Sequence, residues 1–533
     1  MISSHMHKRN IMKYFFLRIF VILVSTVYPR LIVLGYFPNM DEGIYAYWSK
    51  LIHQSLAASH GLPDAGGFSL YPLLLSWIFS LPGMPLIWLR LADMLVAACV
   101  AWLFCRLMEE ESGNHAVGLL VSLAFLCGMN RLDVIDAGFK NSIFAAYLPL
   151  FLALRLCQRP LRASSFRWYG VGALVALAVF LREPFSIFAA LGLLAIWAGW
   201  GFNAAWRYAA GGGLTGLTVL GLTSSARGGM AGLVKYYTDL SKVYTEQSWR
   251  IRNNFLSNGK HSLFSFVGSL GLTALSGCVF VLERRLCRKA GQFVPVDKRA
   301  LFWLAAALLP LLEPLFKIGF VYHFAVCLPG FAGLCALAWR RVECPPLFRL
   351  KRMGAPLASL ACLLALTGLP GPAKFGMTLN VLRQYPSIVW PEQYVLQSNT
   401  LLAAKALHGI LPVGGTLSTS GHTFFLYEVL GVLPPTDGAF APQDIFHLSD
   451  LSRAYLALGK DANRLAEALR ANPPDALAVG FTYSDHEPAF VEGVVEAVRL
   501  SGLYELVTTI PVNKAKDYGW MGYYIYRKRD EHG

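Results

Sequence analysis

The chain has 533 residues, of which 55% are hydrophobic and 15% are charged. Because soluble domains carry about 25% charged residues, this composition indicates an integral membrane protein. The net charge of +15 does not predict a nucleic-acid partner, since many basic residues fall in short segments between apolar runs, as in membrane proteins. The ten cysteines form no CxxC pair, which argues against a zinc site or a disulfide framework.

The first apolar run covers residues 14–34 and follows Lys8, Arg9 and Lys13. It is long and no small-x-small cleavage site follows it, so we predict a membrane helix with a cytosolic N-terminus and not a signal peptide. Residues 35–83 then lie outside. Several aromatic residues in and just after this segment suit helices that lie at the level of the lipid headgroups. They are Tyr45, Tyr47, Trp48, Trp77 and Trp88.

Ten further apolar runs predict a total of about eleven membrane helices. They cover residues 85–105, 116–130, 142–157, 168–182, 185–201, 206–223, 263–282, 300–316, 319–338 and 354–371. Alternation places the basic segments 155–167, 283–299 and 340–352 together in the cytosol. The predicted orientation is therefore N-terminus inside and C-terminus outside.

The sequence changes character after residue 371. Short apolar runs at 416–418, 476–479, 504–510 and 522–526 alternate with a helical stretch at 461–471. This alternation predicts a small α/β domain over residues 372–533 on the exterior face, closed by the basic run Arg527-Lys528-Arg529 as a solvated tail. Residues 1–371 form the transmembrane domain, with exterior loops at 35–83, 131–141 and 224–262.

A glycine-rich stretch at Gly211-Gly212-Gly213-Leu214-Thr215-Gly216 is not a phosphate loop. It lies inside an apolar run and lacks the Lys-Ser/Thr that such a loop requires. Close packing between helices accounts for it better.

Two adjacent carboxylates, Asp41 and Glu42, follow the first membrane span. Ionisable residues at the edge of a bilayer are costly, so such a pair is a functional candidate. An alternative is that Asp41 caps the helix that begins near Ile44.

Other ionisable residues fall on the same predicted exterior face as this pair. Asp133, Asp136 and Lys140 lie between spans three and four, Arg182 between five and six, and Lys317 and His323 around spans nine and ten. Each also has a structural interpretation, because basic residues at an interface often reach toward headgroups and a histidine can cap a helix.

Such a set suits the transfer of a sugar from a lipid carrier. Outside the cytoplasm no supply of ATP or nucleotide sugars is expected, so the donor is best carried on a lipid phosphate. Cations neutralise the phosphate as it leaves, and a carboxylate within hydrogen-bond reach takes the acceptor proton. A single base attacking opposite the phosphate inverts the anomeric centre.

The segment Asp41-Glu42-Gly43-Ile44-Tyr45-Ala46 resembles the Asp-Glu motif in the first exterior loop of GT-C glycosyltransferases. The likeness is greatest to the protein-mannosyltransferase and lipid A aminoarabinose-transferase branch. Asp133 or Asp136 matches the second acidic motif of these enzymes. The segments Tyr322-His323-Phe324 to Leu328-Pro329-Gly330 and Asn472-Pro473-Pro474-Asp475 resemble their late span and their exterior domain.

The resemblance implies that Asp41 is the base, that Glu42 supports it, and that Lys140, Arg182 and His323 bind the donor phosphate. Lys317 and Tyr45 complete the predicted substrate-binding set. Gly43 stands where the aminoarabinose branch usually has a polar or basic residue, which leaves the identity of the donor open.

The sequence thus predicts a polytopic α-helical, GT-C-like membrane protein with a small α/β exterior domain, located in the bacterial inner membrane with a periplasmic active site. Its predicted partners are a polyprenyl-phosphate-linked sugar, membrane lipids and a lipid A, glycan or protein acceptor, without a metal or cofactor requirement. One alternative is a pentosyl (arabinosyl) transferase that modifies a pilin-like protein. Two others are a transporter or flippase of a lipid-linked sugar and a non-catalytic anchor for the exterior domain. The sequence shows neither an internal repeat nor a pair of interrupted helices in matching halves, which argues against the transporter.

Overall fold

The computed structural model describes most of the chain. The described residues are 2–34, 40–58, 70–82, 85–135, 143–158, 166–225, 229–232, 234, 238, 259, 263, 266–289, 298–312, 321–340, 363, 399–421, 423, 425–432, 450–482, 488–512 and 521–529.

Two compact units make up the chain. The first, which we call the helical unit, comprises Met1–Val33, Arg90–Leu222 and Tyr237–Phe375. The second, the mixed unit, comprises Leu34–Leu89, Thr223–Tyr236 and Gly376–Gly533. The segment after the first predicted span therefore belongs with the C-terminal part of the chain. The domain boundary predicted after residue 371 lies outside the described residues and stays a prediction.

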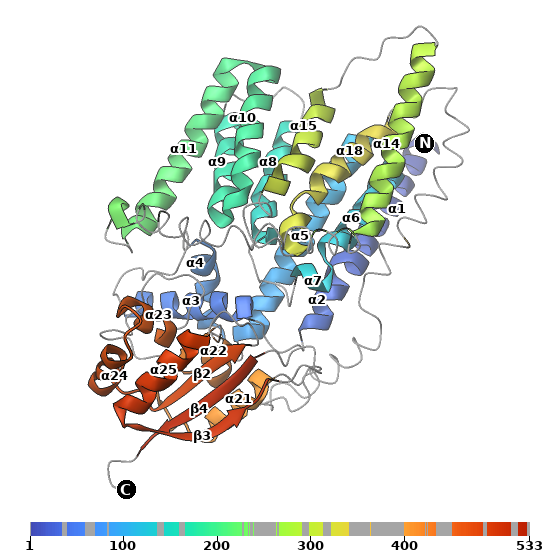
Figure 1. The fold of residues 1–533 in the computed structure, drawn as a ribbon. Coiled ribbons are helices and arrows are strands. Elements are labelled where there is room, and N and C mark those ends of the chain that lie inside the picture. Colours follow the sequence, from blue (N-terminus) through green and yellow to red (C-terminus); the bar gives the residue numbers. More distant parts are fainter. Residues whose placement is uncertain are drawn as a thin grey trace. The chain divides into compact units, whose positions relative to one another are not determined.

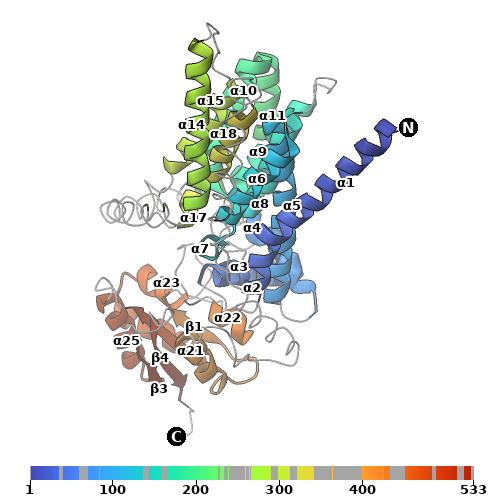
Figure 2. The same ribbon diagram turned by 90° about the vertical axis from the view of Figure 1, so that its right-hand side faces the viewer.

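The helical unit consists of apolar helices (Figures 1 and 2). In chain order they are α1 (Ile2–Ile22), a π-helical turn (Leu23–Val27), α2 (Tyr28–Val33), α5 (Pro85–Ser112, which enters this unit at Arg90), α6 (His115–Met129), α7 (Leu132–Ile135), α8 (Ile143–Gln158), α9 (Arg167–Leu181), α10 (Ser186–Trp200), α11 (Phe202–Ser225), α14 (Val267–Lys289), α15 (Lys298–Leu308), α17 (Val321–Ala325) and α18 (Leu328–Arg340). Helix α18 packs between α14 and α15, α6 contacts α1, α14 and α18, and α9 packs against α8 and α10.

Four helical segments in the described part of the chain are long and apolar enough to cross a membrane: Met12–Ile32, Ile87–Ser112, Glu183–Trp200 and His323–Arg340. Shorter apolar helices include His115–Met129, Ile143–Gln158, Arg167–Leu181 and Val267–Leu282. The predicted count of eleven spans stays a prediction, and the span predicted at 354–371 falls almost wholly outside the described residues.

Glycines allow α9 and α11 to approach within backbone contact. A Cβ added at Gly172 would lie 1.9 Å from the carbonyl oxygen of Tyr208, and one at Gly211 would lie 2.1 Å from that of Tyr169. No side chain fits at such a distance. The glycine-rich stretch thus contributes to helix packing, as the sequence predicted.

We expect Gly172→Ala to destabilise the helical unit by about 1–3 kcal/mol, the usual cost of overpacking a well-packed core. Gly170→Ala on the same helix is the matched control, because nothing lies within 4 Å of a Cβ at that position. Alanine there should be neutral or slightly stabilising, since it favours helix more than glycine does. Thermal unfolding of the two purified variants in detergent gives the comparison, and equal midpoints would contradict the packing role.

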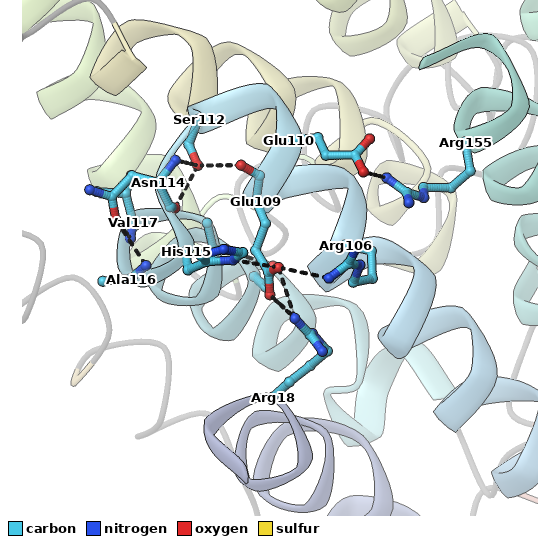
Figure 3. Close-up of polar contacts among 12 residues, drawn as sticks. Arg18, Arg106, Glu109, Glu110, Ser112, Asn114, His115, Ala116, Val117 and Arg155 are labelled. Atoms are coloured by element: carbon cyan, nitrogen blue, oxygen red, sulfur yellow. Dashed lines mark hydrogen bonds and ion pairs between the residues drawn. The ribbon is translucent and has the colours of Figure 1, made fainter. Parts of the chain in front are cut away.

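The last turn of α5 is a hub of ion pairs within the helical unit (Figure 3). Glu109 accepts two hydrogen bonds of 2.8 Å from Nη2 of Arg18 on α1, and one of 2.9 Å joins it to Nδ1 of His115 at the start of α6. Glu110 pairs with Arg155 of α8. Glu111 accepts a hydrogen bond from Gln158 at 2.6 Å.

One residue from each of the three predicted cytosolic segments lies at the same end of α5. Arg155 belongs to the first of them and Arg299, 3.9 Å from Glu111, to the second. Arg340 belongs to the third and packs on Gly113, where an added Cβ would lie 3.7 Å from its Cγ. The three basic segments therefore meet at one end of the helical unit, as the prediction of a shared side requires. Which side of the membrane this end faces stays a prediction.

The mixed unit contains a four-stranded sheet with the strand order β1-β2-β4-β3. The strands are β1 (Leu417–Ser420), β2 (Ala476–Thr482), β3 (Tyr504–Ile510) and β4 (Met521–Lys528). β1 and β2 are parallel, and β4 is antiparallel to both of its neighbours. This confirms a small C-terminal sheet. Arg527 and Lys528, predicted to lie in a solvated tail, instead belong to β4, where Arg527 pairs with Glu505 across the strands.

Helices cover both faces of this sheet. Alternate residues of each strand point to opposite faces, and apolar side chains of the strands are buried on both. On one face, Leu477, Val479 and Tyr526 pack with α23 (Asp450–Ala457), α24 (Ala462–Ala471) and α25 (Pro488–Ser501). On the other, Ala476, Ala478 and Ile525 pack with α21 (Asn399–His408), α22 (Phe425–Leu430) and α3 (Met40–Ala57). Figure 1 shows α24 and α25 on one side of the strands and α21 on the other.

Candidate functional site

The acidic pair lies at the start of α3, which begins at Met40. The Glu42 side chain is buried, whereas the Asp41 side chain lies outside the described part of the chain. Carboxylates are favoured at a helix N-terminus because the unpaired backbone N–H groups there carry partial positive charge. The acidic pair therefore stands at the end of a helix where carboxylates are favoured.

The rest of α3 is part of the core of the mixed unit. Tyr47, Trp48, Leu51 and Ile52 are buried against the sheet and its helices. The prediction that Tyr47 and Trp48 lie at the headgroups is therefore wrong. The segment 35–83 is rich in aromatic residues, but Tyr47 and Trp48 pack in a protein core with residues more than three hundred positions later in the chain.

Tyr45 lies one turn after the acidic pair and faces the short helix α4 (Leu70–Ser76). Its ring meets that of Tyr71 edge to face, with centroids 5.0 Å apart. α4 also packs against α3 more widely. The first turns of α3 are therefore held between α4 on one flank and the sheet domain on another.

A buried hydrogen-bond network links α3 to the end of β1. The rings of Tyr47 and Tyr427 have centroids 5.2 Å apart. The Tyr427 hydroxyl donates to Oδ1 of Asp450, and Oδ1 also accepts the backbone N–H of Thr419 at 3.1 Å. Burial, with the nearby Asp450 carboxylate, raises the pKa of Tyr427 well above its usual value, so the hydroxyl stays protonated and remains a donor.

The predicted residues of the helical unit lie around α7, α8 and α17. Asp133 is on α7, although its side chain lies outside the described part of the chain. α7 packs against α17, which carries the buried His323. Asp136, Lys140 and Lys317 are outside the described residues, and their predicted roles stay predictions.

Arg182 is buried where α9 ends, and its backbone is extended with φ −157° and ψ 114°. Pro184 follows and prevents α9 from continuing. Phe185, next in the turn, packs on Tyr147 of α8 with ring centroids 5.1 Å apart. The Tyr147 hydroxyl in turn donates to the carbonyl of Ala325 on α17 at 3.5 Å. Tyr147 thus connects the turn that carries Arg182 to the helix that carries His323.

The structure brings the predicted residues together in two sets. Asp41, Glu42 and Tyr45 belong to the mixed unit, and Asp133, Arg182 and His323 belong to the helical unit. That the two sets meet around one substrate stays a prediction.

The helical unit also contains a buried polar cluster that was not predicted from the sequence. Nε of Arg30 on α2 donates to Oδ2 of Asp93 on α5 at 2.7 Å, and its Nη1 donates to Oδ1 of Asn130 at the end of α6. The signal was present, because Arg30 and Asp93 both fall inside predicted apolar spans, where ionisable residues are rare and functional by default.

No group of three or more His, Cys, Asp and Glu side chains among the described residues could hold a metal ion. The seven cysteines whose side chains are described are free thiols. Independence of metals and cofactors stays a prediction.

One comparison with known proteins found a likeness. The chain is similar in structure to ArnT from Cupriavidus metallidurans, whose crystal structure is bound to undecaprenyl phosphate, with a TM-score of 0.54, 11% sequence identity and coverage of 97% of each chain. No family model matches the sequence, and no curated protein matches it. The likeness shows that the chain shares the overall fold of that protein.

If α3 depends on the sheet domain, removing its buried ring should weaken the mixed unit. We expect Tyr47→Ala to reduce the stability of that unit by about 3–5 kcal/mol, the usual cost of deleting a buried aromatic side chain. Leu56→Ala on the same helix is the control, since Leu56 is 46% exposed and surface substitutions change stability by about 0.5 kcal/mol or less. Thermal unfolding followed by intrinsic fluorescence measures both, and a Tyr47→Ala midpoint equal to that of Leu56→Ala would show that α3 is not part of this core.

Proposed function

We propose that this protein is an inverting membrane glycosyltransferase of the GT-C type that uses a polyprenyl-phosphate-linked sugar. The observation that carries the proposal is the likeness over nearly the full length of both chains to a protein crystallised with undecaprenyl phosphate. The buried Glu42 and the adjacent Asp41 at the start of α3 add a carboxylate pair suited to base catalysis.

In the proposed reaction an acceptor hydroxyl attacks the anomeric carbon of the donor from the face opposite the phosphate. The bond from that carbon to the phosphate oxygen breaks, and polyprenyl phosphate leaves with both bonding electrons. Asp41 takes the hydroxyl proton, and Glu42 supports it. One displacement forms one glycosidic bond with inversion, and no oxidant or reductant takes part.

The cations act on the leaving group. Charge on the phosphate grows as the glycosidic bond breaks, so cations fixed in advance stabilise the transition state more than the ground state. Arg182 and His323 are buried, and cations in a water-poor site act more strongly than at an exposed surface. Lys140 and Lys317 complete the proposed set.

The proposed location is the bacterial inner membrane with the acidic pair on the periplasmic side, since a lipid carrier supplies donors where nucleotide sugars are absent. The proposed acceptor is a lipid A, surface-glycan or surface-protein hydroxyl. The test of the function is to incubate the purified protein in detergent with undecaprenyl-phosphate-linked hexoses and pentoses and to measure released undecaprenyl phosphate by mass spectrometry. Transport of the lipid in vesicles without release in detergent would favour a flippase and reject the enzyme.

We expect Asp41→Asn to reduce release by at least about a hundredfold, the usual scale for losing a general base, while the protein still purifies as a folded monodisperse species. Asparagine caps helices as well as aspartate does, so a capping role predicts little change. Asp461→Asn is the matched control, because Asp461 is a cap whose Oδ1 accepts the N–H of Asn463 at 2.9 Å and of Arg464 at 3.4 Å. Near-normal turnover of the Asp41→Asn variant would reject the base.

Substitutions of Arg182 distinguish a role in binding the donor phosphate from a role in anchoring the protein to lipid headgroups. Arg182→Ala should weaken binding of undecaprenyl phosphate and slow its release together, and Arg182→Lys should restore the rate only in part, because lysine lacks the planar two-pronged contact. A residue that only reaches toward headgroups accepts lysine freely. Arg155→Ala, which removes the partner of Glu110 at the other end of α8, controls for general effects of losing an arginine. Full recovery with lysine would leave Arg182 without a phosphate-binding role.

A further inference from the structure

Among the described residues of the helical unit, Arg30 is the least exposed basic residue. Its side chain is 1% exposed and that of its partner Asp93 is 6% exposed. Beyond that ion pair, Nη1 also donates to the carbonyl of Thr26 at 3.4 Å, and the guanidinium lies 4.3 Å from the centre of the Phe144 ring. Arg30 therefore contacts four elements: the π-helical turn before its own helix, α5, the end of α6 and the start of α8.

Two of these contacts bracket one segment of the chain. Asn130 immediately precedes residues 131–142, and Phe144 follows them by two positions. One guanidinium thus holds both ends of the segment that contains Asp133, Asp136 and Lys140, three of the residues proposed for the reaction.

The first end of the segment is fixed further by Asn130 itself. Its Nδ2 donates to the carbonyl of Leu126 at 2.7 Å and to Oγ1 of Thr26 at 3.2 Å, so its Oδ1 is aimed at Arg30. The backbone carbonyl of Arg131 then accepts the N–H groups of Val134 and Ile135 at 2.9 Å, which starts α7 directly after this anchor. The placement of α7 against α17 follows from where Asn130 is held.

The second end is fixed by aromatic packing. The Phe144 ring that faces Arg30 also meets the ring of Tyr147 edge to face, with centroids 6.1 Å apart. Tyr147 is the residue that connects α17 to the turn after Arg182. Arg30 is therefore continuous, through Phe144 and Tyr147, with the contacts that carry His323 and Arg182.

Stability alone does not account for an ion pair at this place. Burying two charges costs about as much as their attraction returns, and apolar replacements of such pairs are often neutral or stabilising. A buried pair is better explained where a fixed geometry is needed. The π-helical turn at Leu23–Val27, just before Arg30, belongs to a class of irregularity that is frequent at functional sites.

We propose that Arg30 is a positioning residue, which fixes Asn130 and Phe144 on either side of the segment 131–142 and so sets the geometry of the neighbouring helices for sugar transfer. This inference rests on the proposed function. Asp93 neutralises the guanidinium, and Asn130 and Phe144 transmit its position to the segment.

The experiment compares two buried ion pairs that join the N-terminal helices to α5. Arg30→Met with Asp93→Leu removes the proposed device without leaving a lone buried charge. Arg18→Met with Glu109→Leu is the matched control, since those side chains are 6% and 2% exposed and touch neither end of the segment. Spin labels on cysteines introduced at Ala137 and at Leu194, an exposed position on α10, in a protein without its native cysteines, report the distance distribution between the segment and the helical unit.

We expect the Arg30 pair variant to broaden this distribution and to lower turnover by about a hundredfold, the scale of a displacement of about 1 Å in an active site, while the Arg18 pair variant leaves both unchanged. If the pair variant does not fold, Arg30→Lys tests the positioning role. It keeps the ion pair with Asp93 but cannot contact Asn130 and Phe144 together, so it should fold, broaden the distribution and lose turnover.

A wild-type distribution in Arg30→Lys and in the pair variant would overturn the proposal, and so would equal broadening by both ion-pair variants. If the wild-type protein neither binds undecaprenyl phosphate nor transfers any sugar, the proposed function fails. The distance comparison still accepts or rejects the positioning role in that case.

Discussion

Every charge inside an apolar helical unit needs a partner, because the unit offers too little water to solvate it. Helix α5 shows how this constraint organises the unit. Asp93, near its start, holds Arg30, and Glu109, near its end, holds Arg18. Two buried ion pairs therefore tie the N-terminal helices to α5 at separate points, and the register between them is fixed by charge as well as by packing.

The ends of α5 differ in what surrounds these pairs. At Glu109 the neighbours are charged side chains from several helices, some of them exposed, such as Arg106 at 38% and His115 at 54%. Exposed pairs contribute about 0–1 kcal/mol each, so their value lies in matching basic segments to one end of the unit. At Asp93 the neighbours are Asn130 and Phe144, which border a segment rich in proposed site residues. The pair at Glu109 thus lies near residues of the predicted cytosolic segments, and the pair at Asp93 lies beside the segment that carries several proposed site residues.

Much of this organisation follows from sequence patterns. Some apolar runs predicted helices of the helical unit to within a few residues, as at 116–130 for His115–Met129 and 185–201 for Ser186–Trp200, whereas the run at 14–34 is displaced from α1 (Ile2–Ile22). The strand at Tyr504–Ile510 agrees with its prediction. Short-range periodicity determines such elements, because the side chains that bury a helix or strand face recur along the same element.

What the sequence could not show depends on distant contacts. The aromatic side chains of α3 look the same whether they face lipid or a protein core, and only the fold brings Tyr427 and Leu417 to them. Likewise Arg30 reads as one basic residue in an apolar run, whereas its role comes from Asn130 and Phe144, about a hundred positions later in the chain. Hydropathy predicts whether a side chain is buried, but it does not predict which residues that side chain contacts.

The division of the proposed site between two units has a chemical consequence. Asp41, the proposed base, lies on a helix whose later residues are part of the core of the mixed unit, and the proposed phosphate-binding residues Arg182 and His323 lie in the helical unit. Each set of residues is therefore positioned by the packing of its own unit. Inversion requires the acceptor and the leaving phosphate on opposite faces of the sugar. The proposed mechanism draws its base from one unit and its phosphate-binding residues from the other, and that the two sets meet around one sugar stays a prediction. Because α3 packs on the sheet of the mixed unit, the C-terminal sheet positions the helix that carries the proposed base.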